Sequence, residues 1–230
     1  MNEIIRVLDI DIDDYTAKRA FKETVHYLET EPLSVIEMVT ADTLMYAKED
    51  MTLKENLGKC DMLLPGEKEI LEAAHITDHR HLQEVETRTY LKLLLRYLHK
   101  NHVRVYLLVD TEQDAEELYG YLEQAYSGIQ IVGIAKVSAS DRADDMVVNA
   151  VNGGEADCVF AAMSAPVREE FIVKNRSLIN ARVWLGVGTA VKSFYKTENR
   201  KGRLMQFMIH SIFKREIAKK QREMQIQGLK

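Results

Sequence analysis

Residues 103–134 read VRVYLLVDTEQDAEELYGYLEQAYSGIQIVGI. Two β-branched and aliphatic runs, Val103–Val109 and Ile129–Ile134, flank a segment of helical period from Thr111 to Tyr126. Thr111 is a suitable N-cap for that helix, with an acid, Asp114, three residues further on. A strand, a helix and a second strand in this order predict a layered α/β fold with a largely parallel sheet.

The same alternation extends outward in both directions along the chain. Further strands are expected at Ile4–Ile10, Val35–Val39, Asp61–Leu64, Asp157–Ala162 and Arg182–Val187. Further helices are expected from a Thr16 cap to Tyr27, over Asp141–Val151 and over Pro166–Leu178. The pattern therefore predicts a Rossmann-like layered fold over residues 1–191, and a composition shift after Val191 marks residues 192–230 as a C-terminal appendage.

Composition excludes several classes of protein. The 230 residues are 46% apolar and 29% charged, with only 3 Pro and 11 Gly, as in a globular chain rich in regular structure. The longest segment without a charged residue, Gln124–Ala135, has 12 residues, whereas a membrane span needs about 20. Met1 leads into no secretory signal pattern, so we expect a cytoplasmic protein whose Cys60 and Cys158 are buried thiols.

Charge is distributed unevenly between the two predicted parts. Residues 192–230 hold 11 Lys and Arg against 3 Asp and Glu, which leaves a net charge of -13 on residues 1–191. An acidic body with a basic tail would repel a long phosphate backbone, so nucleic acid is not an expected partner.

The tail has the pattern of an amphipathic basic helix. Its apolar residues recur at helical spacing among Lys and Arg: Leu204, Met205, Met208, Ile209, Ile212 and Phe213. Such a helix can lie on the anionic inner face of the cell membrane. Alternatively, it packs its apolar stripe on the body or on another copy of the chain in a homo-oligomer, and from the residues alone the two interpretations have equal weight.

Parallel sheets bind ligands at the carboxyl ends of their strands, so the turns at that edge are the candidate site. Thr40 and Asp42 follow one strand, where a helix cap is the simpler interpretation. Glu67 and Glu69 open a helix after Pro65-Gly66, where acids favour the helix dipole and Glu67 would also suit a general base.

Two further turns complete this edge. In Ser164-Ala165-Pro166-Val167-Arg168-Glu169, the amides that precede a helix start can meet an anion and Arg168 can add charge to a bound phosphate. The glycines of Gly186-Val187-Gly188 allow close approach of a ligand, although tight packing is the commoner reason for such a pair.

In this order, the turns resemble the WecG/TagA/CpsF family of glycosyltransferases over nearly the whole chain. Five segments carry the resemblance: Ile12–Thr16 for I-D-x-x-T, Val39–Asp42 for V-T-x-N, Asp61–Glu67 for D-x-x-x-P-D-G, Pro166–Glu169 for P-K-Q-E and Gly186–Gly188 for G-V-G. Arg200 also matches the Arg of the family's R-A-P, and Arg88 is the nearest match to a further family Arg.

The resemblance implies an inverting transferase of cell-surface polysaccharide or teichoic acid biosynthesis. It would move a sugar, typically an N-acetylhexosamine, from a UDP-sugar to a polyprenyl-diphosphate-linked acceptor, peripherally at the membrane and without metal or other cofactor. The residues implied around the substrates are Thr40, Asp42, Arg88, Ser164, Arg168, Glu169, Gly186, Gly188 and Arg200. The family's catalytic Asp has become Gly66, which leaves Glu67 as the candidate base.

The replacement of the family's catalytic Asp by Gly66 leaves other functions possible. If Glu67 does not replace the family Asp, the chain is a catalytically inactive relative that binds a nucleotide-sugar or a partner transferase. A third hypothesis is an α/β nucleotide-binding protein whose resemblance is limited to the fold. His75, His79 and His81 fall in a predicted polar loop without an accompanying Cys, so a zinc site is not expected there.

Overall fold

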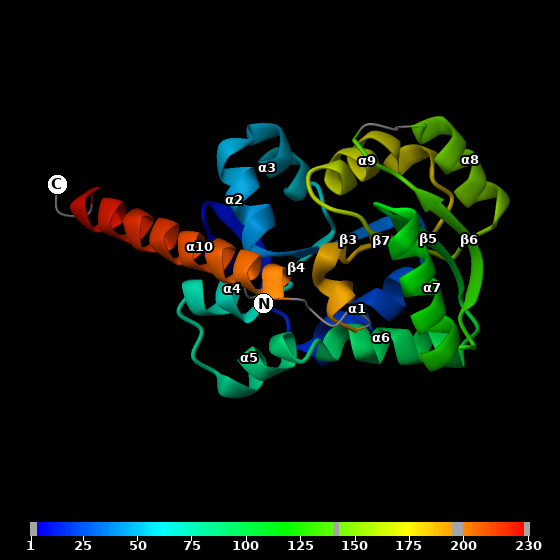
Figure 1. Cartoon of the computed structure of the whole chain (residues 1–230), viewed down its shortest axis with the longest axis horizontal. Coiled ribbons are helices and arrows are strands. Elements are labelled where there is room, and N and C mark those ends of the chain that lie inside the picture. The colour runs from blue at the N-terminus through cyan, green and yellow to red at the C-terminus, as the bar shows by residue number, and fades with distance from the viewer. Residues whose placement is uncertain (1–3, 140–142, 195–199, 228–230) are drawn as a thin grey trace.

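The computed structural model describes residues 4–139, 143–194 and 200–227. Its centre is a six-stranded sheet in the order β4-β3-β8-β7-β5-β6, in which every neighbouring pair is parallel (Figure 1). The strands are β3 (Ser34–Val39), β4 (Met62–Pro65), β5 (Arg104–Val109), β6 (Gln130–Lys136), β7 (Cys158–Ala162) and β8 (Val183–Gly186). The predicted Rossmann-like α/β fold is confirmed.

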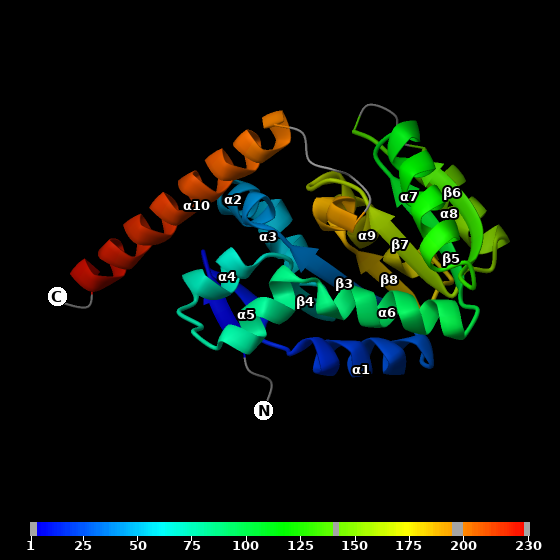
Figure 2. The same ribbon diagram turned by 60° about the horizontal axis from the view of Figure 1, so that its bottom comes forward.

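Helices cover both faces of this sheet. One apolar cluster joins the strands to α1 (Ala17–Leu28), α6 (Thr89–Lys100) and α7 (Glu112–Ala125), and Figure 2 shows α1 and α6 side by side below the sheet. A second cluster joins the opposite face to α8 (Asp144–Gly153) and α9 (Val167–Asn175). Successive strand residues such as Leu107 and Leu108 belong to different clusters, because side chains alternate across a strand.

The first predicted strand, Ile4–Ile10, was wrong in its extent and its place. The structure divides it into a separate antiparallel hairpin of β1 (Ile4–Val7) and β2 (Ile10–Asp13). Leu8 and Asp9 form the turn with φ of 50° and 62°. Asp13 at the end of β2 accepts a hydrogen bond from the Leu63 N–H at 2.9 Å, which ties the hairpin to β4.

The predicted helix starts are largely confirmed. The hydroxyl oxygens of Thr16 and Thr111 accept hydrogen bonds from Arg19 N and Asp114 N, at 3.4 and 3.1 Å. The helix expected over 166–178 is α9 followed by the 3-10 helix η1 (Arg176–Leu178), and the one expected over 141–151 is α8, with residues 141 and 142 outside the described part. Cys60 and Cys158 are both free thiols; Cys158 is buried as expected, whereas Cys60 is only partly buried.

Several short helices surround the carboxyl ends of β3 and β4. They are α2 (Ala41–Glu49), α3 (Met51–Leu57), α4 (Lys68–Ala73) and α5 (His79–Glu86). A third apolar cluster joins the β1–β2 hairpin to α2, α3 and α4. The chain continues from β8 through the 3-10 helix η2 (Gly188–Phe194) to the C-terminal segment.

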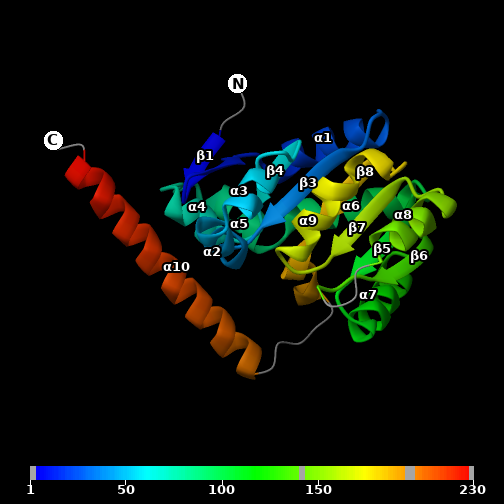
Figure 3. The ribbon, with the colours of Figure 1, turned by 90° about the horizontal axis from the view of Figure 1, so that it is seen from above.

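The tail forms one helix, α10 (Arg200–Gln227), which Figure 3 shows along one side of the body. Phe213 is fully buried in the third cluster, with Ile209 and Ile217 packed against it. Lys48 of α2 pairs with Glu216, and Asp9 of the hairpin turn pairs with Lys220. Part of the predicted stripe therefore packs on the body. A domain boundary after Val191 stays a prediction, and none of the described helices is both long and apolar enough to cross a membrane.

Candidate active site

The candidate site lies where β3 and β4 end beside each other. Val39 pairs with Pro65 at the last position of the parallel register. The Gly66 N–H then donates to the Val39 carbonyl oxygen at 2.7 Å. A Cβ at residue 66 would lie 2.7 Å from that same oxygen, so only glycine lets the two turns approach so closely. This contact places the segments that begin at Thr40 and Glu67 side by side.

Glu67 is held across this junction. It is the N-cap residue of α4 but makes no side-chain cap to its own helix. Its Oε2 instead accepts a hydrogen bond from the Ala41 N–H at 3.0 Å, at the first residue of α2. The free amides at a helix N-terminus attract an anion, so this contact holds the Glu67 carboxylate in place. The Glu67 side chain is still 14% exposed.

Thr40 and Asp42 both lie at the same helix start. Thr40 is the N-cap of α2, and its hydroxyl accepts from the Thr43 N–H at 3.2 Å. Asp42 stands in the first turn, where burial and then the nearby charge of Glu67 raise its carboxyl pKa. Two acids therefore share one small region, and Asp42 favours its protonated form more than an isolated Asp does.

Arg88 approaches the same turn from another element. It precedes α6 in a left-handed conformation, with φ of 54°. Its Nη1 donates to the Gly66 carbonyl oxygen at 2.7 Å. The structure thus brings four predicted site residues together at the β3–β4 junction: Thr40, Asp42, Glu67 and Arg88.

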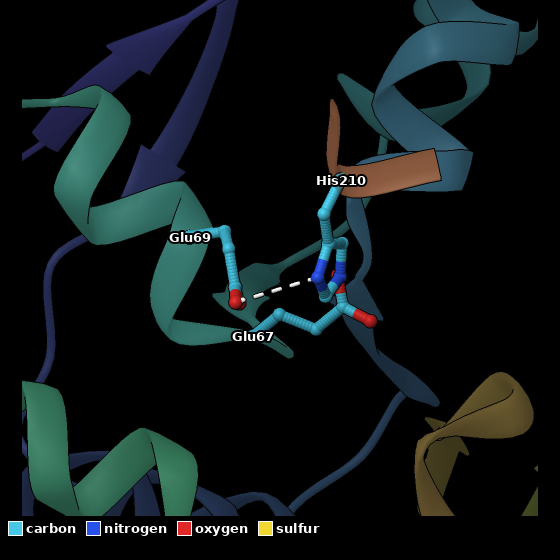
Figure 4. A group of neighbouring side chains, drawn as sticks. All are labelled: Glu67, Glu69 and His210. Carbon is cyan, nitrogen blue, oxygen red and sulfur yellow. Dashed lines mark hydrogen bonds and ion pairs between the residues drawn. The ribbon is translucent and has the colours of Figure 1, made fainter. Parts of the chain in front are cut away.

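His210 joins this group from α10, and the sequence analysis missed it. Its Nε2 lies 3.3 Å from Glu67 Oε2, and its Nδ1 lies 3.4 Å from Glu69 Oε1 (Figure 4). A signal was available, because His210 precedes Phe213 by three residues and Ile217 by seven. That spacing puts His210 on the face of α10 that packs on the body.

Arg168 and Glu169 occupy a different environment from the one predicted. Each is 1% exposed. Arg168 Nε lies 2.6 Å from Glu37 Oε2, and Arg168 Nη2 lies 2.6 Å from Glu169 Oε1. The indole N–H of Trp184 donates to the other Glu37 oxygen at 2.8 Å. A phosphate contact of Arg168 stays a prediction, and in this structure its guanidinium is paired with carboxylates of the protein.

The glycine pair is explained by this buried cluster. A Cβ on Gly186 would lie 1.9 Å from Glu37 Oε2, and one on Gly188 would lie 2.1 Å from Arg168 Nη1. Gly188 also has a φ of 53°, which side chains rarely tolerate. Packing against Glu37 and Arg168 therefore accounts for both glycines, and their contact with a substrate stays a prediction.

The remaining predicted residues lie apart from the junction. Ser164, after β7, donates its hydroxyl to Asp110 Oδ2 at 2.6 Å and its N–H to Asp110 Oδ1 at 2.9 Å. These hydrogen bonds join the turn after β7 to the turn after β5. Arg200 begins α10, and its side chain falls outside the described part of the structure.

The polar loop expected around three histidines was wrong for two of them. His79 and His81 lie in α5, and His81 is 7% exposed with its Nε2 2.8 Å from Asp14 Oδ1. His81 thus anchors α5 to the segment between β2 and α1. Among the described residues, these histidines do not form a three-ligand group.

Chemically, the junction combines a fixed carboxylate with a nearby cation. Glu67 can accept a proton from a hydroxyl group, and the guanidinium of Arg88 can stabilise negative charge that develops beside the Gly66 turn. Such a pair suits the transfer of a group from a phosphorylated donor to a hydroxyl acceptor.

Comparison with known proteins agrees with this chemistry. The model of the glycosyl transferase WecG/TagA/CpsF family matches residues 5–222. Two proteins named N-acetylglucosaminyldiphosphoundecaprenol N-acetyl-beta-D-mannosaminyltransferase, from Staphylococcus aureus strains MRSA252 and NCTC 8325 / PS 47, are each 21% identical to this chain over 198 residues. Each alignment covers 85% of this chain and 77% of the relative.

Proposed function

Because the chain belongs to the glycosyl transferase WecG/TagA/CpsF family, we propose that it transfers N-acetylmannosamine from a UDP-sugar to a polyprenyl-diphosphate-linked N-acetylglucosamine. The family membership supports the reaction class, and the names of the Staphylococcus relatives support the transferred sugar and the lipid-linked acceptor. UDP as the carrier comes from the family resemblance described above.

The observation that carries this proposal is the position of Glu67 across the β3–β4 junction. Among the described residues, its side-chain hydrogen bonds to Ala41 and His210 both use Oε2, so Oε1 is the oxygen that we assign to proton acceptance. In the reaction, an acceptor hydroxyl oxygen forms a bond to the anomeric carbon while Glu67 takes its proton. The bond from that carbon to the diphosphate oxygen breaks on the opposite side, UDP leaves, and the configuration inverts.

The leaving diphosphate requires positive charge. Arg88 is the cation that the structure holds at the Gly66 turn, and stabilisation of charge that develops in the transition state is a major source of catalytic power. Thr40 and Asp42 lie beside the same turn, and we propose that they contact the sugar.

We further propose that α10 holds the enzyme on an anionic membrane, where a lipid-linked acceptor is found. Met205, Met208 and Ile212 are 61%, 58% and 46% exposed, although their neighbour Phe213 is buried. Arg215, Lys219 and Arg222 continue the same helical face and are exposed. Apolar residues followed by basic residues on one outward face are typical of helices that lie in a membrane interface.

The alternative is an inactive relative that binds the nucleotide-sugar or a partner transferase. It is favoured by one observation, which is that Gly66 has no room for a side chain at the place where the family has its Asp. Glu67 then serves only to join α2 and α4.

UDP release separates the two functions. The assay uses UDP-N-acetylmannosamine with a short-chain polyprenyl-diphosphate N-acetylglucosamine present or absent, and it compares wild type with Glu67→Gln. Glu72→Gln is the matched control, because Glu72 is an exposed acid of the same helix. Acceptor-dependent release that is lost only in Glu67→Gln establishes the transferase. UDP binding without release in the wild type establishes the inactive relative.

A further inference from the structure

An imidazole from the C-terminal helix lies between two carboxylates at the start of α4. His210 of α10 places Nε2 3.3 Å from Glu67 Oε2 and Nδ1 3.4 Å from Glu69 Oε1, so each ring nitrogen faces a different acid (Figure 4). The side chains of Glu67, Glu69 and His210 are 14%, 16% and 23% exposed. Most of the solvent is therefore kept from the group, which strengthens the attraction between opposite charges.

The two acids determine which hydrogens the ring must carry. An ionised carboxylate accepts hydrogen bonds and donates none, so each contact requires an N–H on the imidazole. Only the imidazolium form has a hydrogen on both nitrogens. In this arrangement His210 is a cation, and its charge lies between Glu67 and Glu69, whose like charges would otherwise repel each other.

We propose that His210 is a positioning residue for Glu67, and that Glu69 orients His210. Glu67 Oε2 is held from two directions, by the Ala41 N–H at 3.0 Å and by His210 Nε2. Two donors on one oxygen restrict rotation of the carboxylate, so Oε1 is presented to an acceptor hydroxyl at a fixed place. Glu69 holds the opposite ring nitrogen, as the carboxylate of a catalytic triad holds its histidine. This role rests on the proposed function of Glu67 as the base.

Other contacts attach α10 to the body. Phe213 is buried in the third apolar cluster, and Glu216 and Lys220 of α10 pair with Lys48 and Asp9. These contacts do not involve Glu67. The attachment of α10 therefore does not depend on His210 alone, and a loss of His210 can be separated experimentally from a loosened helix.

Initial rates of UDP release test the role of His210. His210→Ala should lower kcat by about 10–100-fold, because a misplaced base slows proton transfer, and KM should change little, because Thr40 and Arg88 remain. Glu216→Gln is the matched control: it removes a different contact between α10 and the body and should leave kcat unchanged. Added imidazole should restore part of the rate of His210→Ala, because the truncated side chain leaves space for the free ring. It should restore none in Glu67→Gln.

Non-additivity tests the role of Glu69. Glu69→Ala should lower kcat in wild type, but it should lower kcat no further in His210→Ala, because Glu69 acts through the ring. Glu72→Ala, at an exposed acid of the same helix, should leave kcat unchanged in both backgrounds. Losses that add in the double variant would mean that Glu69 does not act through His210.

The outcomes separate this role from the proposed function. Wild-type release that His210→Ala leaves unchanged would overturn the role of His210 alone. Equal losses in His210→Ala and Glu216→Gln without rescue by imidazole would also overturn it, and His210 would then only attach α10. A wild type without acceptor-dependent release would overturn both. The contact itself is checked by NMR of the histidine ring nitrogens: the His210 signal, assigned by its absence from His210→Ala, should change in Glu67→Gln and Glu69→Gln but not in Glu72→Gln.

Discussion

Arg168 and Glu37 are in direct contact in the interior of the protein, with 2.6 Å between Nε and Oε2 and side chains that are 2% and 0% exposed. Glu169 contacts the same guanidinium. The cluster thus holds one cation and two carboxyl groups out of contact with water. Because a buried charge without a partner is costly, one of the two carboxyls is expected to hold a proton near neutral pH.

Glu37 is that group, and the first prediction concerns its proton. Burial raises the pKa of Glu37 from 4.5 to about 7; Arg168 opposes this shift, and Glu169 adds to it. At a pH between these two pKa values, Glu37 has lost its proton in the unfolded chain but still holds it in the folded chain. Stability is therefore complete below the unfolded pKa and falls as the pH rises through the folded pKa, by at most about 1.4 kcal/mol per pH unit.

Glu37→Gln should flatten this decline. The amide oxygen can still accept from the Trp184 N–H, and Arg168 is left with Glu169 as a neutral pair. Urea unfolding from about pH 5 to about pH 8 measures the slope. Glu123→Gln, at an exposed position of α7, is the control. An equal slope in wild type and Glu37→Gln would assign the pH dependence to other groups.

The second prediction concerns the close approach of the two turns at the site. In Gly66→Ala the new methyl group meets the Val39 carbonyl oxygen at 2.7 Å, and a main-chain atom cannot move aside cheaply. We expect a loss of about 1–3 kcal/mol in the free energy of unfolding. Gly66→Asp meets the same obstacle, so restoring an acid at this position should also lower stability.

Gly120→Ala is the matched control for that prediction. Gly120 lies within α7, and a Cβ there meets no atom within 4 Å. Alanine should therefore stabilise the protein by about 0.5–1 kcal/mol, through the better helix propensity of Ala. If Gly66→Ala and Gly120→Ala shift the urea midpoint equally, the close approach of residue 66 to the Val39 carbonyl oxygen is contradicted.

The alternation of apolar strands and amphipathic helices was enough to predict the sheet and most of its strands. The β1–β2 hairpin was missed because its turn, Leu8-Asp9, has no Gly, Pro or Asn, and the apolar pattern continues through it. The strand-end rule placed Thr40, Asp42 and Glu67 at one edge, and the structure brings them together.

Sequence reasoning failed where long-range packing determines the environment. From the sequence around it, Arg168 resembles an exposed cation. Its burial becomes clear only from its contact with Glu37 of β3. Glu37 was a usable signal, because an acid within the apolar run Val35–Val39 needs a buried cation or proton. The approach of His210 to Glu67 depends on how α10 packs on the body, which local periodicity does not specify.

The third prediction separates the two faces of α10. Replacing both Met208 and Ile212 by Gln should reduce co-sedimentation with vesicles that contain anionic lipid, because their exposed side chains form the proposed membrane face. The melting temperature should not change. Residual binding should weaken further in high salt, which screens Arg215 and Lys219. Vesicle binding that is unchanged in the double variant would contradict a membrane role for this face.

Phe213→Ala is the counterpart on the inner face. Phe213 is fully buried between α10 and the body, so its truncation should lower the free energy of unfolding by about 3–5 kcal/mol. The comparison shows whether a loss of vesicle binding comes from the outward side chains or from a detached helix.

The last prediction tests whether Glu67 acts through its position as well as its charge. Glu67→Asp keeps the carboxylate but withdraws it by one methylene, so it can no longer both reach the Ala41 N–H and face the acceptor. A misplacement of about 1 Å at a reacting group can cost about 100-fold in rate, and we expect kcat to fall by about that factor. KM should change little, because the proposed substrate contacts of Thr40 and Arg88 remain. Initial rates of UDP release measure both constants. If Glu67→Asp is as active as wild type, Glu67 is not the base. A carboxylate that only joins α2 to α4 need not be placed as accurately as a group that takes a proton from the acceptor.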